Sequence, residues 1–223
     1  MDLQRIEGIF TAPDEIMTII GCGAIGSQVA VQLTKLGCEK FKLYDIDEVE
    51  AHNFVNQAYR VDQIGMNKVD ALSQLIKEIN PKAEIETFHG TVEEIHKLEE
   101  NLEGYVFLGP DKVSVRKHCL TKNKTNMSVL GWFDCRTELW AIQAFCIPHT
   151  AEGIKMLLDT LDFTDEEAEK NIPRATSGCH SKLASGITSA LGALTVAKLF
   201  VDFVKTKKNR FFTRIDVENY VID

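Results

Sequence analysis

Three glycines and one acid near the N-terminus have the types and spacing that suit nucleotide binding. Gly21, Gly23 and Gly26 form a G-x-G-x-x-G pattern that begins inside the apolar run MTIIGC. In such a pattern the first glycine permits a tight turn, the second lets the backbone approach phosphate, and the third lets the helix pack close to the strand. Asp45 ends a second apolar segment, where its carboxylate can accept hydrogen bonds from ribose hydroxyls.

The glycine pattern by itself leaves the identity of the nucleotide open. Ala24 and Ile25 complete the turn, and the helix that follows offers unpaired N–H groups and partial positive charge to phosphates. Most such fingerprints bind dinucleotides, which favours NAD, and a tight turn without any ligand is the plainer alternative. Residues further along the chain have to decide between these interpretations.

The elements that would position these residues alternate between strand and helix. The patterns predict strands at 17–22, 40–47, 83–88, 104–109, 127–134 and 140–147, and a terminal edge strand at 210–222. They predict helices at 25–36, 67–80, 92–102, 112–122, 150–162 and 181–206, with a loop at 163–180.

This alternation predicts an α/β fold, Rossmann-like and doubly wound, with a mostly parallel sheet and an antiparallel extension in the C-terminal part. Ligand would then bind at the carboxyl ends of the first strands. No Pro-, Gly- or Ser-rich linker interrupts the chain. We therefore expect one nucleotide-binding domain over 1–223.

The stretch DIDEVEAHNFVNQAYRVDQIGMNKVDAL, which follows the second strand, resembles the adenylating enzymes of the ThiF/MoeB/HesA and ubiquitin-activating superfamily. The residues that match that pattern are Asp45, Asp47, Val49, Glu50, Asn53, Gln57, Ile64, Gly65 and Lys68. A second block, YVFLGPDKVSVRKHC, is similar to the family's D-N-x-x-x-R segment through Asp111 and Arg116, with Lys112 in place of the asparagine. The resemblance is specific over 16–122 and looser over 128–223.

The resemblance implies an ATP-dependent adenylyltransferase. Asp45 would bind the ribose of ATP, Asn53 and Lys68 would contact the phosphates, and Asp111 would hold Mg²⁺. Asp47 and Gln57 complete the implied cofactor site. The chemistry is consistent with these residue types, because a carboxylate and ATP are both anions and meet only where cations and N–H donors offset their charge.

Two departures from the family pattern affect the predicted site. Asn56 stands where the family has an arginine that meets the triphosphate. Arg60, or Arg5 acting from a partner subunit, would have to supply that charge; the alternative for both is an ordinary surface arginine. The family's structural zinc is held by two CxxC pairs, which this sequence lacks, so we expect no zinc.

Cys179 is a candidate nucleophile for a thioester intermediate. It lies in the segment IPRATSGCHSKLASG before the long helix, and a helix N-terminus stabilises a thiolate. The alternative is a small residue that seats the helix.

The composition of the chain limits the kinds of binding partner and the cellular location that we expect. The net charge is −8 and the pI about 5.3, which argues against binding to nucleic acid or to an anionic membrane surface. Six cysteines without CxxC spacing are typical of reduced thiols in a cytoplasmic protein. We see no signal peptide, and the apolar stretch 183–204 is interpreted as a buried helix rather than a membrane span.

The resemblance finally suggests the substrate and the assembly. We expect the substrate carboxylate to be the C-terminus of a small ubiquitin-like or sulfur-carrier protein, or of a peptide, and the enzyme to be a homodimer. Two alternatives stay open: an NAD(P)-dependent oxidoreductase, and a non-catalytic nucleotide-binding scaffold of the same fold.

Overall fold

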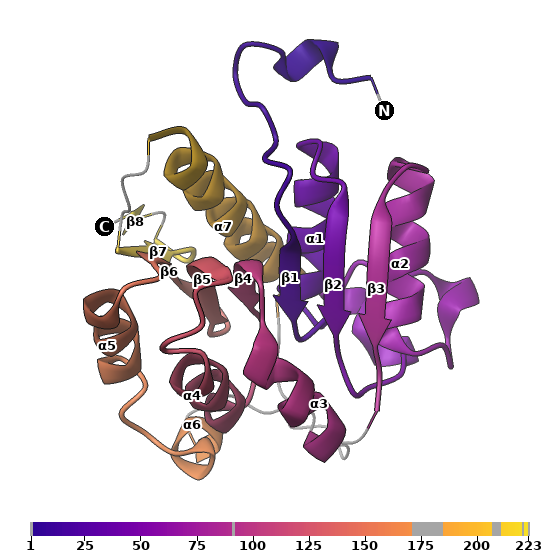
Figure 1. Cartoon of the computed structure of the whole chain (residues 1–223). Coiled ribbons are helices and arrows are strands. Elements are labelled where there is room, and N and C mark those ends of the chain that lie inside the picture. Colours follow the sequence, from indigo (N-terminus) through magenta and orange to yellow (C-terminus); the bar gives the residue numbers. More distant parts are fainter. Residues whose placement is uncertain (1, 91, 171–184, 207–210, 220, 223) are drawn as a thin grey trace.

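The computed structural model of the chain describes residues 2–90, 92–170, 185–206, 211–219 and 221–222. Its strands form one sheet in the order β3-β2-β1-β4-β5-β6-β7-β8 (Figure 1). The strands are β1 (Met17–Ile20), β2 (Lys40–Tyr44), β3 (Glu84–Phe88), β4 (Gly104–Leu108), β5 (Val129–Thr137), β6 (Ala141–Pro148), β7 (Phe212–Asp216) and β8 (Val221–Ile222).

The direction of the strands divides the sheet into two parts. Neighbouring strands from β3 to β5 pair in parallel, and those from β5 to β8 pair antiparallel. The chain reverses its direction across the sheet between β1 and β4, which is where ligands bind in open α/β sheets. The predicted fold class, with its antiparallel extension, is confirmed.

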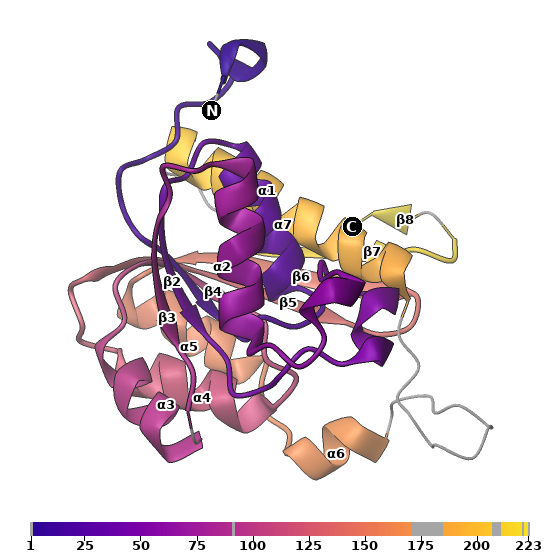
Figure 2. The ribbon, with the colours of Figure 1, turned by 90° about the vertical axis from the view of Figure 1, so that its right-hand side faces the viewer.

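Helices cover both faces of the sheet (Figure 2). The α-helices are α1 (Gly26–Lys35), α2 (Lys68–Ile79), α3 (Val92–Leu98), α4 (Val113–Lys122), α5 (Ala151–Asp159), α6 (Asp165–Lys170) and α7 (Gly186–Thr206), and the short 3-10 helices are η1 (Gln4–Ile6), η2 (Ala51–Val55), η3 (Val61–Gln63) and η4 (Glu99–Asn101). One face carries α1, α2 and α7 over a core that includes Leu33, Leu72 and Phe200. The other carries α3 to α6, with Trp132 in its core.

The ends of α1 and α2 follow from local sequence. Gly37 adopts φ +95°, a conformation that L-residues with side chains avoid, and its N–H donates to the carbonyl of Thr34. This ends α1 as predicted. Pro81 comes directly after Asn80, the C-cap of α2, and cannot continue the helix.

The fold differs from the sequence prediction in two places. The predicted loop at 163–180 contains a short helix, α6, whose first turn is held by a reciprocal pair: the N–H of Thr164 donates to Glu167 and the N–H of Glu167 donates to the Thr164 hydroxyl. The predicted terminal strand is broken into β7 and β8, because Asp216 accepts hydrogen bonds from Asn219 and closes a turn. β8 forms the edge of the sheet.

The helix α7 is long and apolar enough to cross a membrane by length and composition. One side of it is nevertheless packed against β5, β6 and α1, with Ala193, Val196 and Phe200 among its buried residues. Its first residue, Gly186, lies against η2, where an added Cβ would come within 2.3 Å of the Val55 carbonyl oxygen.

Candidate functional site

The three glycines of the turn between β1 and α1 differ in their surroundings. Gly21 adopts φ +79°, and a Cβ there would lie 2.7 Å from the backbone nitrogen of Pro110. A Cβ on Gly26 would lie 1.9 Å from the carbonyl oxygen of Gly21. Around Gly23, in contrast, a Cβ would meet nothing within 4 Å. Two glycines therefore close the turn, and the third faces open space into which a ligand can come.

The remaining turn residues fix the start of α1. Ile25 is buried and packs toward α7, where a Cβ on Gly192 would lie 3.1 Å from its Cδ1. Ser27 donates both its N–H and its hydroxyl to the carbonyl of Gly23. Ala24, which follows Gly23, is half-buried. The first turn of the helix leaves N–H groups without intrahelical partners, which suits an anion.

Asp45 lies beside this turn at the end of β2. Its Oδ2 accepts the N–H of Cys22 at 2.6 Å and its Oδ1 accepts the N–H of Asp47 at 2.8 Å. Burial raises the pKa of Asp45, and the positive charge of Lys68 opposes that shift. Each carboxylate oxygen can accept more than one hydrogen bond. The side chain is thus oriented by the turn and retains capacity for ribose hydroxyls.

Lys68, the first residue of α2, brings a buried positive charge to the segment that follows β2. Its side chain is 8% exposed, and its Nζ lies 2.7 Å from Oδ2 of Asp47, which is 58% exposed. The backbone holds the pair in place, since the N–H of Lys68 donates to the carbonyl of Asp47. A buried ammonium with an exposed partner can exchange that partner for a phosphate oxygen.

The segment 51–60 is tied to the first turns of α1. Asn53 is buried, and its Oδ1 accepts the N–H of Glu50. The amide of Gln28 donates to the carbonyl of Asn56, and the N–H of Ala58 donates to the hydroxyl of Ser27. These bonds place the segment beside the glycine turn.

Gln57 has an unusual environment within that segment. Its Oε1 is buried, and no hydrogen-bond partner for it is found among the described residues. Buried polar atoms normally have a partner. The place of Gln57 in the nucleotide site stays a prediction.

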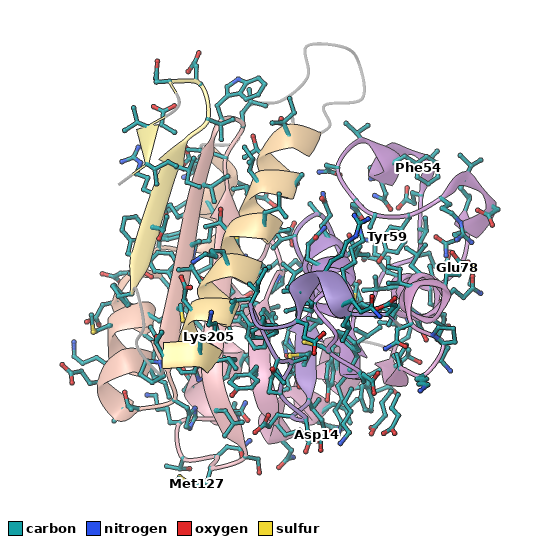
Figure 3. The ribbon with its side chains drawn as sticks, turned by 90° about the horizontal axis from the view of Figure 1, so that it is seen from above. Asp14, Phe54, Tyr59, Glu78, Met127 and Lys205 are labelled. Atoms are coloured by element: carbon teal, nitrogen blue, oxygen red, sulfur yellow. The ribbon has the colours of Figure 1, made fainter. Side chains whose placement is uncertain are left out.

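Tyr59 is a structural member of the site that the sequence analysis missed. Its buried hydroxyl donates to the carbonyl of Cys22 at 2.6 Å, and the carbonyl of Lys68 lies 3.2 Å away. Figure 3 shows Tyr59 near Phe54, on the far side of the molecule from Asp14 and Met127, which precede β1 and β5. One side chain thus links the glycine turn to the start of α2.

Two arginines, Arg60 and Arg5, were predicted to supply the charge that is missing at Asn56. Arg60 forms ion pairs with Asp62, at 3.1 Å, and with Glu78, so its guanidinium is engaged on the surface. Arg5 is exposed in η1, and a Cβ on Gly37 would touch neighbouring Leu3. That end of α1 is about 15 Å, one helix length, from the glycine turn. The roles predicted for Arg60 and Arg5 stay predictions.

Asp111 follows β4 on the segment that lies against the glycine turn. It is exposed, three residues beyond the end of β4. The segment before it presses on the glycine turn, because a Cβ on Gly109 would lie 2.9 Å from the carbonyl oxygen of Gly21. A carboxylate is a ligand that Mg²⁺ prefers, and the ion commonly takes its other ligands from phosphate and water. Asp111 fits a Mg²⁺ bound together with nucleotide.

The described part of the chain contains no group of three or more His, Cys, Asp or Glu side chains able to hold a metal by themselves. The expectation of no zinc stays a prediction. The described cysteines, Cys22, Cys38, Cys119, Cys135 and Cys146, are buried. Burial raises the pKa of Cys22 well above its ordinary value, so this thiol is inert. The predicted nucleophile, Cys179, lies outside the described residues.

Curated relatives match parts of the chain. Ubiquitin-like modifier-activating enzyme 5 of Arabidopsis thaliana is 41% identical over 92 residues, which are 40% of this chain and 21% of that protein. The enzyme of the same name from Drosophila simulans is 30% identical over 144 residues, 60% of this chain and 34% of that protein. The matched part of the chain spans about a fifth to a third of these relatives.

Solved structures match almost all of the chain at low identity. PaaA aligns over 93% of this chain and 62% of its own, with a TM-score of 0.70 and 20% identity. E. coli MccB with ATP aligns over 95% and 63%, with a TM-score of 0.69 and 17% identity. At such identities the likeness shows the fold.

A sequence model of the ThiF family matches residues 14–220. That range includes the glycine turn, Asp45, Lys68 and Asp111, which belong to the segments that follow the carboxyl ends of β1, β2 and β4. The chain belongs to the ThiF family.

Proposed function

We propose that the protein is an ATP-dependent adenylyltransferase that activates a carboxylate, with the C-terminus of a small ubiquitin-like carrier protein or of a peptide as its substrate. A carboxylate oxygen attacks the α-phosphorus of ATP and forms an acyl–phosphate bond. The bond from the α-phosphorus to the bridging oxygen breaks, and pyrophosphate leaves with that electron pair. The product is an acyl-adenylate.

The observation that carries the proposal is the juxtaposition at the carboxyl ends of β1, β2 and β4. The open space at Gly23 receives the phosphates against the N–H groups of α1. Asp45, held by two backbone N–H groups, takes the ribose. Lys68 exchanges Asp47 for a phosphate oxygen and keeps a positive charge beside the reacting anions.

Asp111 would hold Mg²⁺ in this arrangement. When bound, the ion neutralises phosphate charge and orients the pyrophosphate leaving group. The protein places the carboxylate of Asp111 beside the glycine turn, because the segment 109–110 lies against Gly21.

The relatives support the substrate class. Ubiquitin-like modifier-activating enzyme 5 is named for the activation of a ubiquitin-like modifier, and MccB is a microcin C7 biosynthetic enzyme solved in complex with N-formylated MccA and, separately, with ATP. We extend to this chain the common chemistry, which is activation of a protein or peptide chain. A homodimer, a cytoplasmic location and a thioester at Cys179 are part of the same proposal.

Exchange of labelled pyrophosphate into ATP tests the proposal. Free-acid peptides and small carrier proteins should each be compared with the same molecule carrying a C-terminal amide, which cannot attack phosphorus. Exchange that requires the free carboxylate and ATP is the expected result. Exchange with no member of the panel, together with binding of NADH, would support the oxidoreductase instead.

A nucleotide-binding scaffold is the second candidate function. It is favoured by Asn56, which cannot replace the charge of an arginine, and by the engagement of Arg60 with Asp62 and Glu78. A scaffold would bind ATP without supporting exchange. Cys179→Ala separates a further step, because it should leave exchange intact and abolish any conjugate that a reducing thiol releases.

A further inference from the structure

A second cluster of buried charge lies at the carboxyl ends of β4 and β5. Asp134 is fully buried and is paired with Leu108 in the register of the two strands. Its carboxylate forms ion pairs with Arg116 and with Arg136, whose Nη2 lies 2.7 Å from Oδ2. One negative charge thus faces two positive charges in a region that excludes water. Such an arrangement is stable only if the geometry is well defined.

Arg116 connects this cluster to the segment that carries Asp111. Its Nη1 donates to the carbonyl of Leu108 at 3.1 Å, and its Nη2 donates to the carbonyl of Cys135 at 3.2 Å. Leu108 leads directly into Gly109, which lies against the glycine turn. The guanidinium thereby fixes the point at which β4 ends.

The two arginines are held by different groups. Arg136 is anchored by the carbonyl and hydroxyl of Thr160, at 3.0 and 2.9 Å, and lies 4.6 Å from the centroid of the Phe145 ring. Burial lowers the pKa of Arg116, and the charge of Asp111 acts against that shift. Arg116 is thus paired with Asp134 and lies within the electrostatic influence of Asp111.

We propose that Asp134 is a positioning residue for the metal-binding carboxylate. By pairing with Arg116, it fixes the end of β4 and limits the pull of the guanidinium on Asp111. The inference rests on the proposed function, which assigns Mg²⁺ to Asp111. Without the charge of Asp134, two buried arginines retain Asp111 as their nearby counter-charge, and Mg²⁺ has to compete with Arg116 for it.

The test is the Mg²⁺ dependence of nucleotide binding, measured with a fluorescent ATP analogue at fixed concentration while Mg²⁺ is varied. Asp134→Asn should raise the Mg²⁺ concentration at half-maximal binding about tenfold, as expected for one uncompensated charge a short distance away. Arg136→Gln removes a positive charge from the same cluster, so it should lower that concentration. Glu103→Gln is the matched control, since it removes one negative charge beyond the opposite end of β4, where Glu103 pairs with Lys42.

The opposite signs separate positioning from general structural damage. If Arg136→Gln leaves the Mg²⁺ requirement unchanged or raises it, or if Asp134→Asn leaves it at the wild-type value, the inference is overturned. If Asp134→Asn does not fold, a lowered Mg²⁺ requirement in Arg136→Gln supports the inference, and an unchanged or raised requirement overturns it. Wild-type protein that binds the analogue with no dependence on Mg²⁺ would instead contradict the metal site of the proposed function.

Discussion

Two clusters of charge at the carboxyl edge of the sheet are built in opposite ways. In the pair of Lys68 and Asp47, the cation is 8% exposed and the carboxylate 58%. In the cluster of Asp134, Arg116 and Arg136, the carboxylate is 0% exposed and the guanidinium groups 6% and 16%. The first pair can exchange its partner at small cost, which is what a ligand site needs. The second can lose its buried carboxylate only at a large cost in stability.

The largest effect on stability should come from removing the buried carboxylate of Asp134 from its cluster with Arg116 and Arg136. Asp134→Ala leaves two buried guanidinium groups without their carboxylate, and we expect a loss of about 3–5 kcal/mol in the free energy of unfolding. Denaturant titration measures it. Glu103→Ala, which breaks the partly exposed pair with Lys42, should cost about 1 kcal/mol or less. Equal losses for the two variants would erase the distinction between the clusters.

A change in the pair of Lys68 and Asp47 should affect ligand binding rather than stability. Lys68→Met keeps the length and apolar body of the side chain but removes the charge. We expect ATP to bind roughly 10–100-fold more weakly, as for the loss of one hydrogen bond to a charged group. Calorimetric titration with ATP gives the affinity. Lys198→Met is the control with the same change in net charge, because Lys198 pairs with Asp202 on the exposed side of α7; an equal weakening there would remove the phosphate role of Lys68.

A second buried acid, Glu99, sharpens the comparison because no ion pair joins it to a cation of the described residues. Its side chain is 1% exposed, and burial raises its pKa from 4.5 to about 7, against a hydrogen bond from Cys119. The folded state therefore keeps the proton that the unfolded state releases. Stability is full below about pH 4.5 and falls as the pH rises to about 7.

Glu99→Gln mimics the protonated side chain at every pH. Its stability relative to the wild type should increase by about 2 kcal/mol between pH 5 and pH 8, as followed by denaturant unfolding at several pH values. The neighbouring Glu100 is exposed, and its hydrogen bond with Lys122 lowers its pKa. Glu100→Gln should give a small change of opposite sign. A pH-independent difference for Glu99→Gln would show that the carboxyl is not held neutral.

The smallest effect distinguishes the glycines of the turn. Gly23→Ala adds a methyl group into open space, so the free energy of unfolding should stay within about 0.5 kcal/mol of the wild type. ATP should nevertheless bind about tenfold more weakly, because the methyl group occupies the path of the phosphates. Loss of stability with unchanged binding would mean that the open space is not the phosphate site.

Local patterns were sufficient to predict the parallel half of the fold. Apolar strands, helical spacing and Gly37 are visible in the sequence, and the glycine turn fixes where β1 meets α1. Two elements were missed although a signal exists. Thr164 and Glu167 form a Thr-x-x-Glu capping box, which predicts the start of α6. Asp216 lies three residues before Asn219 and accepts its N–H, and an aspartate is a residue that commonly begins a turn.

The long-range part of the site was less accessible. The contact of Tyr59 with the glycine turn spans 37 residues, and sequence periodicity does not specify such a bond. The cluster of Asp134 has a weak signal, since an acid within the apolar strand VLGWFDC requires a buried partner. Which arginines supply it depends on the packing of α4 against the sheet. The residues for nucleotide binding lie within or beside recognisable motifs, whereas a supporting contact such as that of Tyr59 with Cys22 joins residues far apart in the sequence.

The central claim is that the triphosphate of ATP lies over the glycine turn. A crystal structure with Mg²⁺ and a non-hydrolysable ATP analogue tests it most directly. We predict the phosphates in the open space at Gly23, the ribose at Asp45, and Lys68 turned from Asp47 to a phosphate oxygen, with Mg²⁺ bound by Asp111. An analogue bound elsewhere, or with Lys68 and Asp111 directed away from its phosphates, would contradict the account.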